Sequence, residues 1–346
     1  MNRKTLCISL LAFIFISCNN NKLKEIENLD TINLKHSEII DLESKEILNP
    51  IDVFKIDGYF VFRNHHTKNK VFTFMSDDYA KVYSGVSKGN GPNEVTEIID
   101  LKRYKNDVFV MDVGHQTLNK LILKDDSVTI EKQINCKLVF GSSFALLDGC
   151  RFVAPTTPAF EKPGMLALVD STSKVQSLLE YPEECHIQGI DTFALAAFYC
   201  NTRVAVSPDG KHYAYGVYGE TSFGFGDIID NSFENNKTIV YKQVEFDKSS
   251  PNYIITTRDN LMSTATIVPT DKYAIFLYIG KPYKGWNSTN SNTLLLFSWS
   301  GRLCKKVILD MELMTIDFDD KTKILYGIAL NPEACLVKYD LSELFL

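Results

Sequence analysis

Two short polar segments of this 346-residue sequence carry side chains that could bind a metal or transfer a proton. His65 and His66 are adjacent in the first segment, and Asp112 and His115 lie close together in the second. Imidazole and carboxylate groups serve both as zinc ligands and as general acids or bases, so the four could belong to a hydrolase or lyase. No third ligand stands at a fixed spacing from the histidines, and Asp112 is expected to cap a neighbouring loop rather than to neutralise a cation. Hydrolysis or elimination is therefore the alternative hypothesis.

The glycine-rich segment SKGNGPNEV, residues 87–95, raises the question of phosphate binding. A P-loop requires a Lys-Ser or Lys-Thr pair after its last glycine, and none follows Gly91. A dinucleotide-binding fingerprint requires a third glycine where Glu94 stands, followed by a helix rather than the β-branched VTEII. The segment is therefore predicted to be a crossing between two β-rich units.

Recognisable catalytic motifs are absent from the sequence. There is no G-x-S-x-G elbow and no H-E-x-x-H pair, which would identify a nucleophile or a zinc site. Neighbouring carboxylates such as Asp77-Asp78 occur in turn-like segments, where solvation explains them. The sequence thus favours a protein without catalytic residues, metal or cofactor, although residues far apart in sequence could still converge in a fold.

The elements that must position these residues repeat along the chain. Each unit is a β-rich run, a polar loop and a second β-rich run, and successive units begin about 53 residues apart. Alternating Val, Ile, Tyr and Phe predict strands throughout, with no convincing amphipathic helix. The six units are Gly58–Met75, Asp107–Leu123, Cys150–Asp170, His212–Asp230, Tyr273–Trp299 and Lys323–Asp340.

Each unit has room for one strand before it and one after it, so the sequence predicts an all-β, six-bladed β-propeller. The last unit has only three strands before the chain ends at Leu346. Near the N-terminus, the segment 31–42 is a strand without a unit of its own. We expect it to complete the last blade and close the ring, which removes open sheet edges.

Two loops resemble those of a known group of propellers. SPDG, residues 207–210, suits a tight turn between strands and resembles the repeated turn of TolB-like propellers. Gly89, Gly91, Pro92 and Glu94 resemble the G-x-G-P-x-E segment that follows the first blade in exported six-bladed propellers of Bacteroidetes. The resemblance spans nearly the whole mature chain and implies an exported TolB-like propeller lipoprotein, a family whose molecular function is largely uncertain.

The N-terminus has the pattern of an export signal. Arg3 and Lys4 precede an apolar run from Leu6 to Ile16, which is too short to span a membrane. The junction Phe15-Ile16-Ser17-Cys18 resembles a bacterial lipoprotein signal, which implies lipid on Cys18 and a membrane partner; a plain cleaved signal is the alternative. We predict a signal peptide at 1–17, a tether at 18–30 and a propeller at 31–346, located in the cell envelope on the periplasmic side or the outer-membrane surface.

Charge and cysteine content narrow the possible partners. The formal charge of −6 becomes about −8 without the signal, and no Lys/Arg block is present, which disfavours nucleic-acid binding. No C-x-x-C pair occurs among the remaining cysteines. Export permits disulfides, but several cysteines lie in apolar runs. We expect mostly free core thiols with at most one bridge, and a disulfide framework is the alternative.

The predicted fold places the candidate ligand-binding residues on one face. In a four-stranded blade, the loop between the second and third strands and the crossing to the next blade emerge together, around one mouth of the channel. Blades 4 and 5 are expected to carry the longest of these loops, the first containing Phe223 and Phe225, and long loops on a rigid scaffold commonly hold ligands. The candidates are Arg63, His65, His66, Glu94, Asp112, His115, Tyr218, Glu220, Tyr283, Trp286 and Asn331.

Together these features favour a non-catalytic binding module for a peptide, glycan or protein of the envelope. Its aromatic loop residues Tyr283 and Trp286 could instead fold back onto their blade. A purely structural scaffold, contacting its partner through blade edges, is a further hypothesis.

Overall fold

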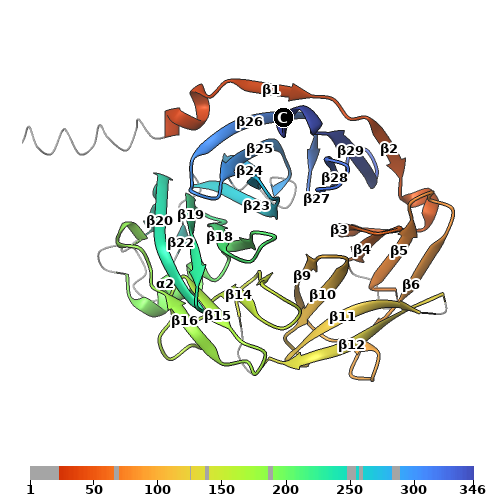
Figure 1. Cartoon of the computed structure of the whole chain (residues 1–346), viewed down its shortest axis with the longest axis horizontal. Helices are drawn as coiled ribbons and strands as arrows, with labels where there is room; N and C mark the ends of the chain where they lie inside the picture. The colour runs from red at the N-terminus through yellow and green to blue at the C-terminus, as the bar shows by residue number, and fades with distance from the viewer. Residues whose placement is uncertain are drawn as a thin grey trace, which may run out of the picture.

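A computed structural model describes residues 23–65, 70–124, 126–136, 140–185, 190–247, 255–256, 260–282 and 289–346. Cys18, His66, Tyr283 and Trp286 lie outside these residues. Six sheets of four or five strands follow one another round a ring (Figure 1). The chain is a six-bladed β-propeller, as the repeat predicts.

Each blade runs from an innermost strand beside the central axis to an outermost strand. Blade 1 contains β3 (Pro50–Ile56), β4 (Tyr59–Asn64), β5 (Phe72–Ser76) and β6 (Val82–Gly85). Blade 2 contains β9 (Ile98–Tyr104), β10 (Asp107–Asp112), β11 (Thr117–Lys124) and β12 (Ser127–Asn135). Blade 3 contains β13 (Ala145–Leu146), β14 (Phe152–Pro155), β15 (Leu166–Val169) and β16 (Val175–Leu179).

The second half of the ring has the same order. Blade 4 contains β17 (Arg203–Val206), β18 (His212–Gly216), β19 (Thr221–Ile229) and β20 (Ser232–Lys242). Blade 5 contains β23 (Leu261–Pro269), β24 (Tyr273–Pro282), β25 (Ser291–Ser298) and β26 (Leu303–Leu313). Blade 6 contains β27 (Thr315–Asp319), β28 (Ile324–Ala329), β29 (Cys335–Asp340) and, from the N-terminus, β2 (Glu38–Asp41).

The six sequence units correspond to the two central strands of the six blades. These strands pack against neighbouring blades on both faces, so most of their residues are buried rather than every second one; all four residues of β14 and of β15 are buried. The SPDG turn joins β17 to β18, with Gly210 at φ +74°.

The N-terminal segment closes the ring in two steps rather than one. β2 pairs antiparallel with β29 and completes blade 6, as expected for the segment 31–42. β1 (Thr31–Leu34) instead pairs parallel with β26 and makes a fifth strand on blade 5. Figure 1 shows both strands, in red, along the outside of the blue blades. Between them, His36 binds Asp310 of β26 through its Nδ1 atom at 2.9 Å, which fixes the step from one blade to the next.

The predicted tether at 18–30 is too long. Residues 23–28 form a short helix, and Ile26 is buried with Phe225 and Phe297 of blades 4 and 5. The carbonyl of Ile26 accepts a hydrogen bond from Lys306 Nζ at 3.2 Å. Because the Ile26 side chain is part of the core, residues 23–30 belong to the folded part of the chain and not to a tether.

Two expectations about the connections are wrong. The loop between β18 and β19 is short, because Phe223 and Phe225 belong to β19, where both are buried in the core between blades 4 and 5. The crossing from blade 3 to blade 4 contains a helix, α2 (Thr192–Tyr199), in a chain for which no helix was expected. Six cysteines, Cys136, Cys150, Cys185, Cys200, Cys304 and Cys335, have free thiols. Within the described ranges, no helix is long and apolar enough to cross a membrane.

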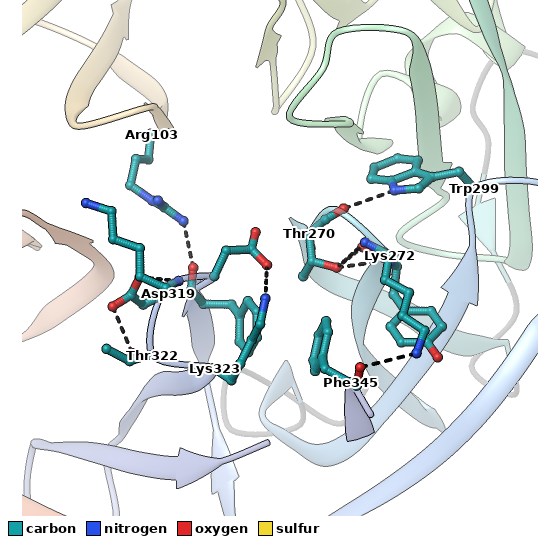
Figure 2. A network of polar contacts seen from close by, with 12 residues as sticks. Arg103, Thr270, Lys272, Trp299, Asp319, Thr322, Lys323 and Phe345 are labelled. Carbon is teal, nitrogen blue, oxygen red and sulfur yellow. Dashed lines mark hydrogen bonds and ion pairs between the residues drawn. The ribbon is translucent and has the colours of Figure 1, made fainter. Parts of the chain in front are cut away.

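The shorter crossing loops pack locally, and so does the C-terminus. β7 (Ser87–Lys88) and β8 (Glu94–Val95) pair within the crossing from blade 1 to blade 2, and β21 (Phe246–Asp247) pairs with β22 (Ile255–Thr256) after blade 4. Phe345 stacks on Phe318 of blade 6, with ring centroids 5.0 Å apart. Figure 2 shows Lys272 reaching the carbonyl of Phe345, a contact of 3.4 Å that ties the end of the chain to blade 5.

Candidate functional site: the central cavity

The loops between second and third strands lie on the same face as the crossings between blades. Backbone hydrogen bonds join them directly: the N–H of Val113 donates to the carbonyl of Glu97, and that of His65 to the carbonyl of Asn49. We call this side of the ring the crossing face. It is the face on which the sequence placed its candidate residues.

A cavity of about 1010 Å³ runs along the ring axis towards the crossing face. The innermost strands of all six blades line it, together with α2 and the loop between β18 and β19. Its volume is at the upper end of the range for small-molecule sites. Its wall divides into two parts of different chemistry.

Blades 6, 1 and 2 form the charged wall. Their innermost strands share one short pattern, in which an aspartate follows isoleucine and precedes an apolar residue: Ile51-Asp52-Val53, Ile99-Asp100-Leu101 and Ile316-Asp317-Phe318. All three aspartates line the cavity. Each has a cationic partner: Asp52 contacts Arg63 at 2.6 Å, Asp100 contacts Lys102 at 2.9 Å, and Asp317 contacts Arg103 at 3.2 Å.

The third pair links blades that are not neighbours. Arg103 of blade 2 donates to Asp317 and also, at 2.7 Å, to the carbonyl of Phe318 in blade 6. The backbone N–H of Lys55 in blade 1 donates to the other oxygen of Asp317 at 2.7 Å. Burial raises the pKa of Asp317, while the Arg103 guanidinium acts to lower it. One carboxylate thus joins three consecutive blades around the axis.

Blades 3, 4 and 5 form the apolar wall. Ala145, Val204, Met262 and Ile267 are among its lining residues, and no carboxylate of the described chain lines this half. Arg203 of β17 is its one charged lining side chain among those residues.

Helix α2 continues the apolar wall at the mouth. Asp191 caps its N-terminus by accepting a hydrogen bond from the N–H of Ala194 at 2.7 Å. The helix sequence TFALAAFY has no polar face, which is unusual for a helix on a protein surface. Leu195, Ala196 and Tyr199 pack into the core, whereas Phe193, Ala194, Ala197 and Phe198 line the cavity, and Phe193 is 67% exposed.

A buried carboxyl supports this helix from below. Glu220 accepts a hydrogen bond from the Tyr199 hydroxyl at 2.9 Å, and both residues are 1% exposed. Its Oε1 atom is buried and has no hydrogen-bond partner in the described chain. Burial raises the pKa of Glu220 to about 7, and it raises the pKa of the nearby Cys185 thiol to about 12. A carboxyl in such surroundings holds its proton until near-neutral pH.

Of the predicted site residues that the structure describes, two line the cavity wall, Arg63 and Tyr218. Glu220 lies beneath the mouth, as described above. Asn331 is exposed in the loop between β28 and β29. The N–H of His65 donates to Asn49, and His115 pairs with Asp112.

Asp112 is a loop cap in this structure. It is fully buried, and its oxygens accept hydrogen bonds from the N–H groups of Thr96 and Glu97 and from His115 Nδ1 at 2.9–3.1 Å. Burial alone would raise the pKa of Asp112, but the hydrogen bonds from Thr96 and Glu97 outweigh it and hold the pKa below its usual value. These contacts hold the end of β10 to the crossing that precedes β9.

Glu94 organises the G-x-G-P-x-E crossing. Its Oε2 accepts a hydrogen bond from the N–H of Gly91 at 2.6 Å, and its carboxylate lies where a side chain on Gly89 would stand. Both glycines are therefore explained by the close approach of this carboxylate, with no bound phosphate required. Asn93 accepts a hydrogen bond from the N–H of Ile130, which attaches the turn to the outer strand of blade 2.

Sequence reasoning missed the residues that actually line the cavity, chiefly Asp52, Asp100, Asp317 and Arg203. A signal was available, because an aspartate recurs at the same place in three innermost strands, where apolar residues are the rule. Among the residues that the structure describes, no group of three or more His, Cys, Asp or Glu side chains could hold a metal ion.

Comparisons with known proteins find distant likenesses among solved structures. No family model and no curated protein matches the sequence. Similar solved structures include the β-propeller domain of Cps50 (Swd1) from Myceliophteria thermophila, at 11% identity and a TM-score of 0.45, covering 89% of this chain and 99% of that one. A mitotic checkpoint complex structure matches at 11% identity and a TM-score of 0.48, covering 90% of this chain and 93% of its own. Such distant likenesses carry no argument about ligands.

Proposed function

We propose that this chain is an exported, lipid-anchored TolB-like propeller that binds a peptide, glycan or protein of the cell envelope without catalysing a reaction. The observation that carries the binding function is the cavity of about 1010 Å³, to which all six blades contribute. Pre-formed concave sites with an apolar wall and a few polar groups are typical ligand sites. The export signal and the lipoprotein-like junction at Cys18 support the location.

Two features favour binding over catalysis. The acidic side chains described on the cavity wall are each joined to a cation, and Asp112, one of the four candidates of the alternative hypothesis, is fully buried beneath its loop. Neither arrangement leaves a carboxylate beside an accessible nucleophile. The apolar rim formed by α2 suits retention of a ligand rather than turnover of one.

Filling the mouth of the cavity with a bulky side chain tests the binding function. Ala197→Trp adds a large ring to an exposed position on the cavity wall, whereas Ala80→Trp adds the same ring to an exposed turn between β5 and β6, at the opposite end of the blade. Thermal unfolding is measured against pools of N-acetylated tetrapeptides and against neutral oligosaccharides. We expect one class to raise the Tm of the wild type and of Ala80→Trp, but not of Ala197→Trp. A panel that stabilises none of the three proteins, or all three equally, contradicts a cavity site.

The anchor is tested separately. Cells expressing the full chain should incorporate labelled palmitate into the protein, and Cys18→Ala should abolish the label. Labelling that survives this substitution contradicts lipid attachment at Cys18.

A further inference from the structure

The charges on the cavity wall do not cancel. Three carboxylates, from Asp52, Asp100 and Asp317, face four cations, from Arg63, Lys102, Arg103 and Arg203. The first three cations are each in contact with one of the carboxylates. Arg203 therefore supplies a net positive charge on the described lining, and it does so on the apolar wall.

Arg203 is held in place by groups that do not neutralise it. Its Nε donates to the carbonyl of Ala265 at 3.1 Å, and one terminal nitrogen donates to the carbonyl and the hydroxyl of Ser142 at 2.8 and 3.0 Å. The Tyr218 ring covers the guanidinium, with its centroid 5.6 Å from Cζ. In the described chain, no carboxylate is within ion-pairing distance of this side chain. A guanidinium fixed by neutral partners keeps its full charge and is pre-organised to bind an anion.

The surroundings of Arg203 define what the rest of the anion must look like. Val204 and Ala205 follow it on β17. Ala197 and Phe198 of α2 also line the cavity, and the Phe198 ring lies against Gly219, the neighbour of the Tyr218 that covers Arg203. Asn201, also on the wall, lies between the helix and β17. A ligand with its negative charge at Arg203 therefore places the adjoining atoms against an apolar surface.

We propose that this part of the cavity, the Arg203 subsite, binds the C-terminal carboxylate of a peptide whose last side chain is apolar. The carboxylate pairs with the guanidinium, and the apolar side chain packs against α2. A long-chain fatty acid would also offer a carboxylate, but the remainder of its chain would lie against the charged wall. A peptide backbone, with its polar N–H and C=O groups, matches that wall better. The inference rests on the proposed binding function and specifies its ligand.

The test compares peptides that differ only at the C-terminus. Two equimolar pools of N-acetylated tetrapeptides ending in Leu, Val or Phe are titrated by calorimetry, one pool with free carboxylates and one with amidated ends. We expect the wild type to bind the free-carboxylate pool at least about tenfold more tightly, because an ion pair with a fixed guanidinium is worth more than a neutral contact. Arg203→Met should reduce that ratio to about one.

A matched substitution controls for charge alone. Arg302→Met removes one positive charge from an exposed residue in the loop between β25 and β26, away from the cavity wall, and should leave the ratio unchanged. Circular dichroism and Tm verify that Arg203→Met is folded; if it is not, Arg203→Lys, which keeps the charge but not the planar fork, should lower the ratio instead.

The outcomes separate this inference from the proposed function. If both pools bind equally in the wild type, or Arg203→Met keeps the preference, the carboxylate subsite is wrong while the cavity remains a binding site. If neither pool binds but decanoate does, with loss in Arg203→Met, the ligand is a free fatty acid and the peptide proposal is overturned. If no carboxylate probe binds the wild type, the subsite is likewise overturned.

Discussion

The two walls of the cavity use charge in opposite ways. On blades 6, 1 and 2, aspartates and cations contact one another, and the Arg103–Asp317 pair joins non-adjacent blades. On blades 3, 4 and 5, the cation at position 203 is held by carbonyls and a hydroxyl, and the Glu220 carboxyl beneath the mouth is buried against a tyrosine. The charged wall therefore stabilises the ring, whereas the apolar wall retains an unneutralised charge that a ligand can bind.

The crossings attached to the two walls differ in the same sense. The crossing from blade 1 to blade 2 folds on itself, since the Glu94 carboxylate binds the turn that contains it. The crossing from blade 3 to blade 4 instead forms α2, whose apolar residues reach the cavity and whose Phe193 is largely exposed. The crossing from blade 1 to blade 2 only connects blades, whereas the crossing from blade 3 to blade 4 presents an apolar surface to the cavity.

The largest loss of stability should follow removal of the Asp317 charge, which links three blades. Asp317→Asn leaves the guanidinium of Arg103 without its carboxylate in a largely buried position. We expect the free energy of unfolding to fall by about 4 kcal/mol, the usual cost of breaking a buried ion pair from one side. Chemical denaturation measures the loss. Asp57→Asn, which breaks an exposed pair with Lys321, should leave stability nearly unchanged, and equal losses would mean that the buried pair has no special role.

The carboxyl beneath the apolar wall should make stability depend on pH. The folded-state pKa of Glu220 is about 7, above its ordinary value of 4.5, so the folded chain retains a proton that the unfolded chain has released. The contribution of Glu220 to the free energy of unfolding is therefore fully present below pH 4.5. It falls by about 3 kcal/mol as the pH rises to 7. Cys185, Tyr199 and Tyr215, whose pKa values burial also raises, stay neutral in this window.

Denaturation of wild type and Glu220→Gln between pH 4.5 and 7.5 checks this sign. The wild type should lose stability relative to the variant as the pH rises. Asp112→Asn is the matched control from the other half of the ring: the pKa of Asp112 is lowered, so its contribution is lost only as the pH falls below about 4. A flat difference for Glu220→Gln would mean that this carboxyl is ionised in the folded protein.

The smallest loss of stability should come from a substitution in the crossing from blade 1 to blade 2. Gly89→Ala places a methyl group against the Glu94 carboxylate, which must shift and weaken its bond to Gly91. We expect a loss of about 1–2 kcal/mol, and a smaller loss when Glu94 is already alanine, because the clash is then absent. Gly149→Ala, where nothing lies within 4 Å of the added carbon, is the control. Equal losses in both Glu94 backgrounds would show that the glycine serves another purpose.

The sequence predicts the fold well because the fold repeats. Six similar apolar hairpins predict six blades. An N-terminal strand without a unit predicts the strand that completes the last blade by pairing with β29. The step of β1 onto blade 5 was not predictable, since either outer strand offers an unpaired edge. Helix α2 was missed because TFALAAFY lacks the periodicity of an amphipathic helix.

The site was predicted less well than the fold. Loop sequences supplied the candidates, and among the candidates that the structure describes Arg63 and Tyr218 line the cavity wall. The others with described side chains mostly hold loops together, as Asp112 and Glu94 do. The cavity is instead lined by innermost strands, where Asp100 and Arg203 resemble ordinary strand residues until a ring brings them together around one axis.

The N-terminal strands β1 and β2 pair with strands from the opposite end of the chain. β1 and β2 are synthesised first, yet their partners β26 and β29 are among the last strands to leave the ribosome. The earliest strands must therefore wait, unpaired, for almost the entire chain to follow. If residue 18 is fixed to a membrane during that interval, the ring closes beside the bilayer, and the latest-made strands come to rest next to the anchored end.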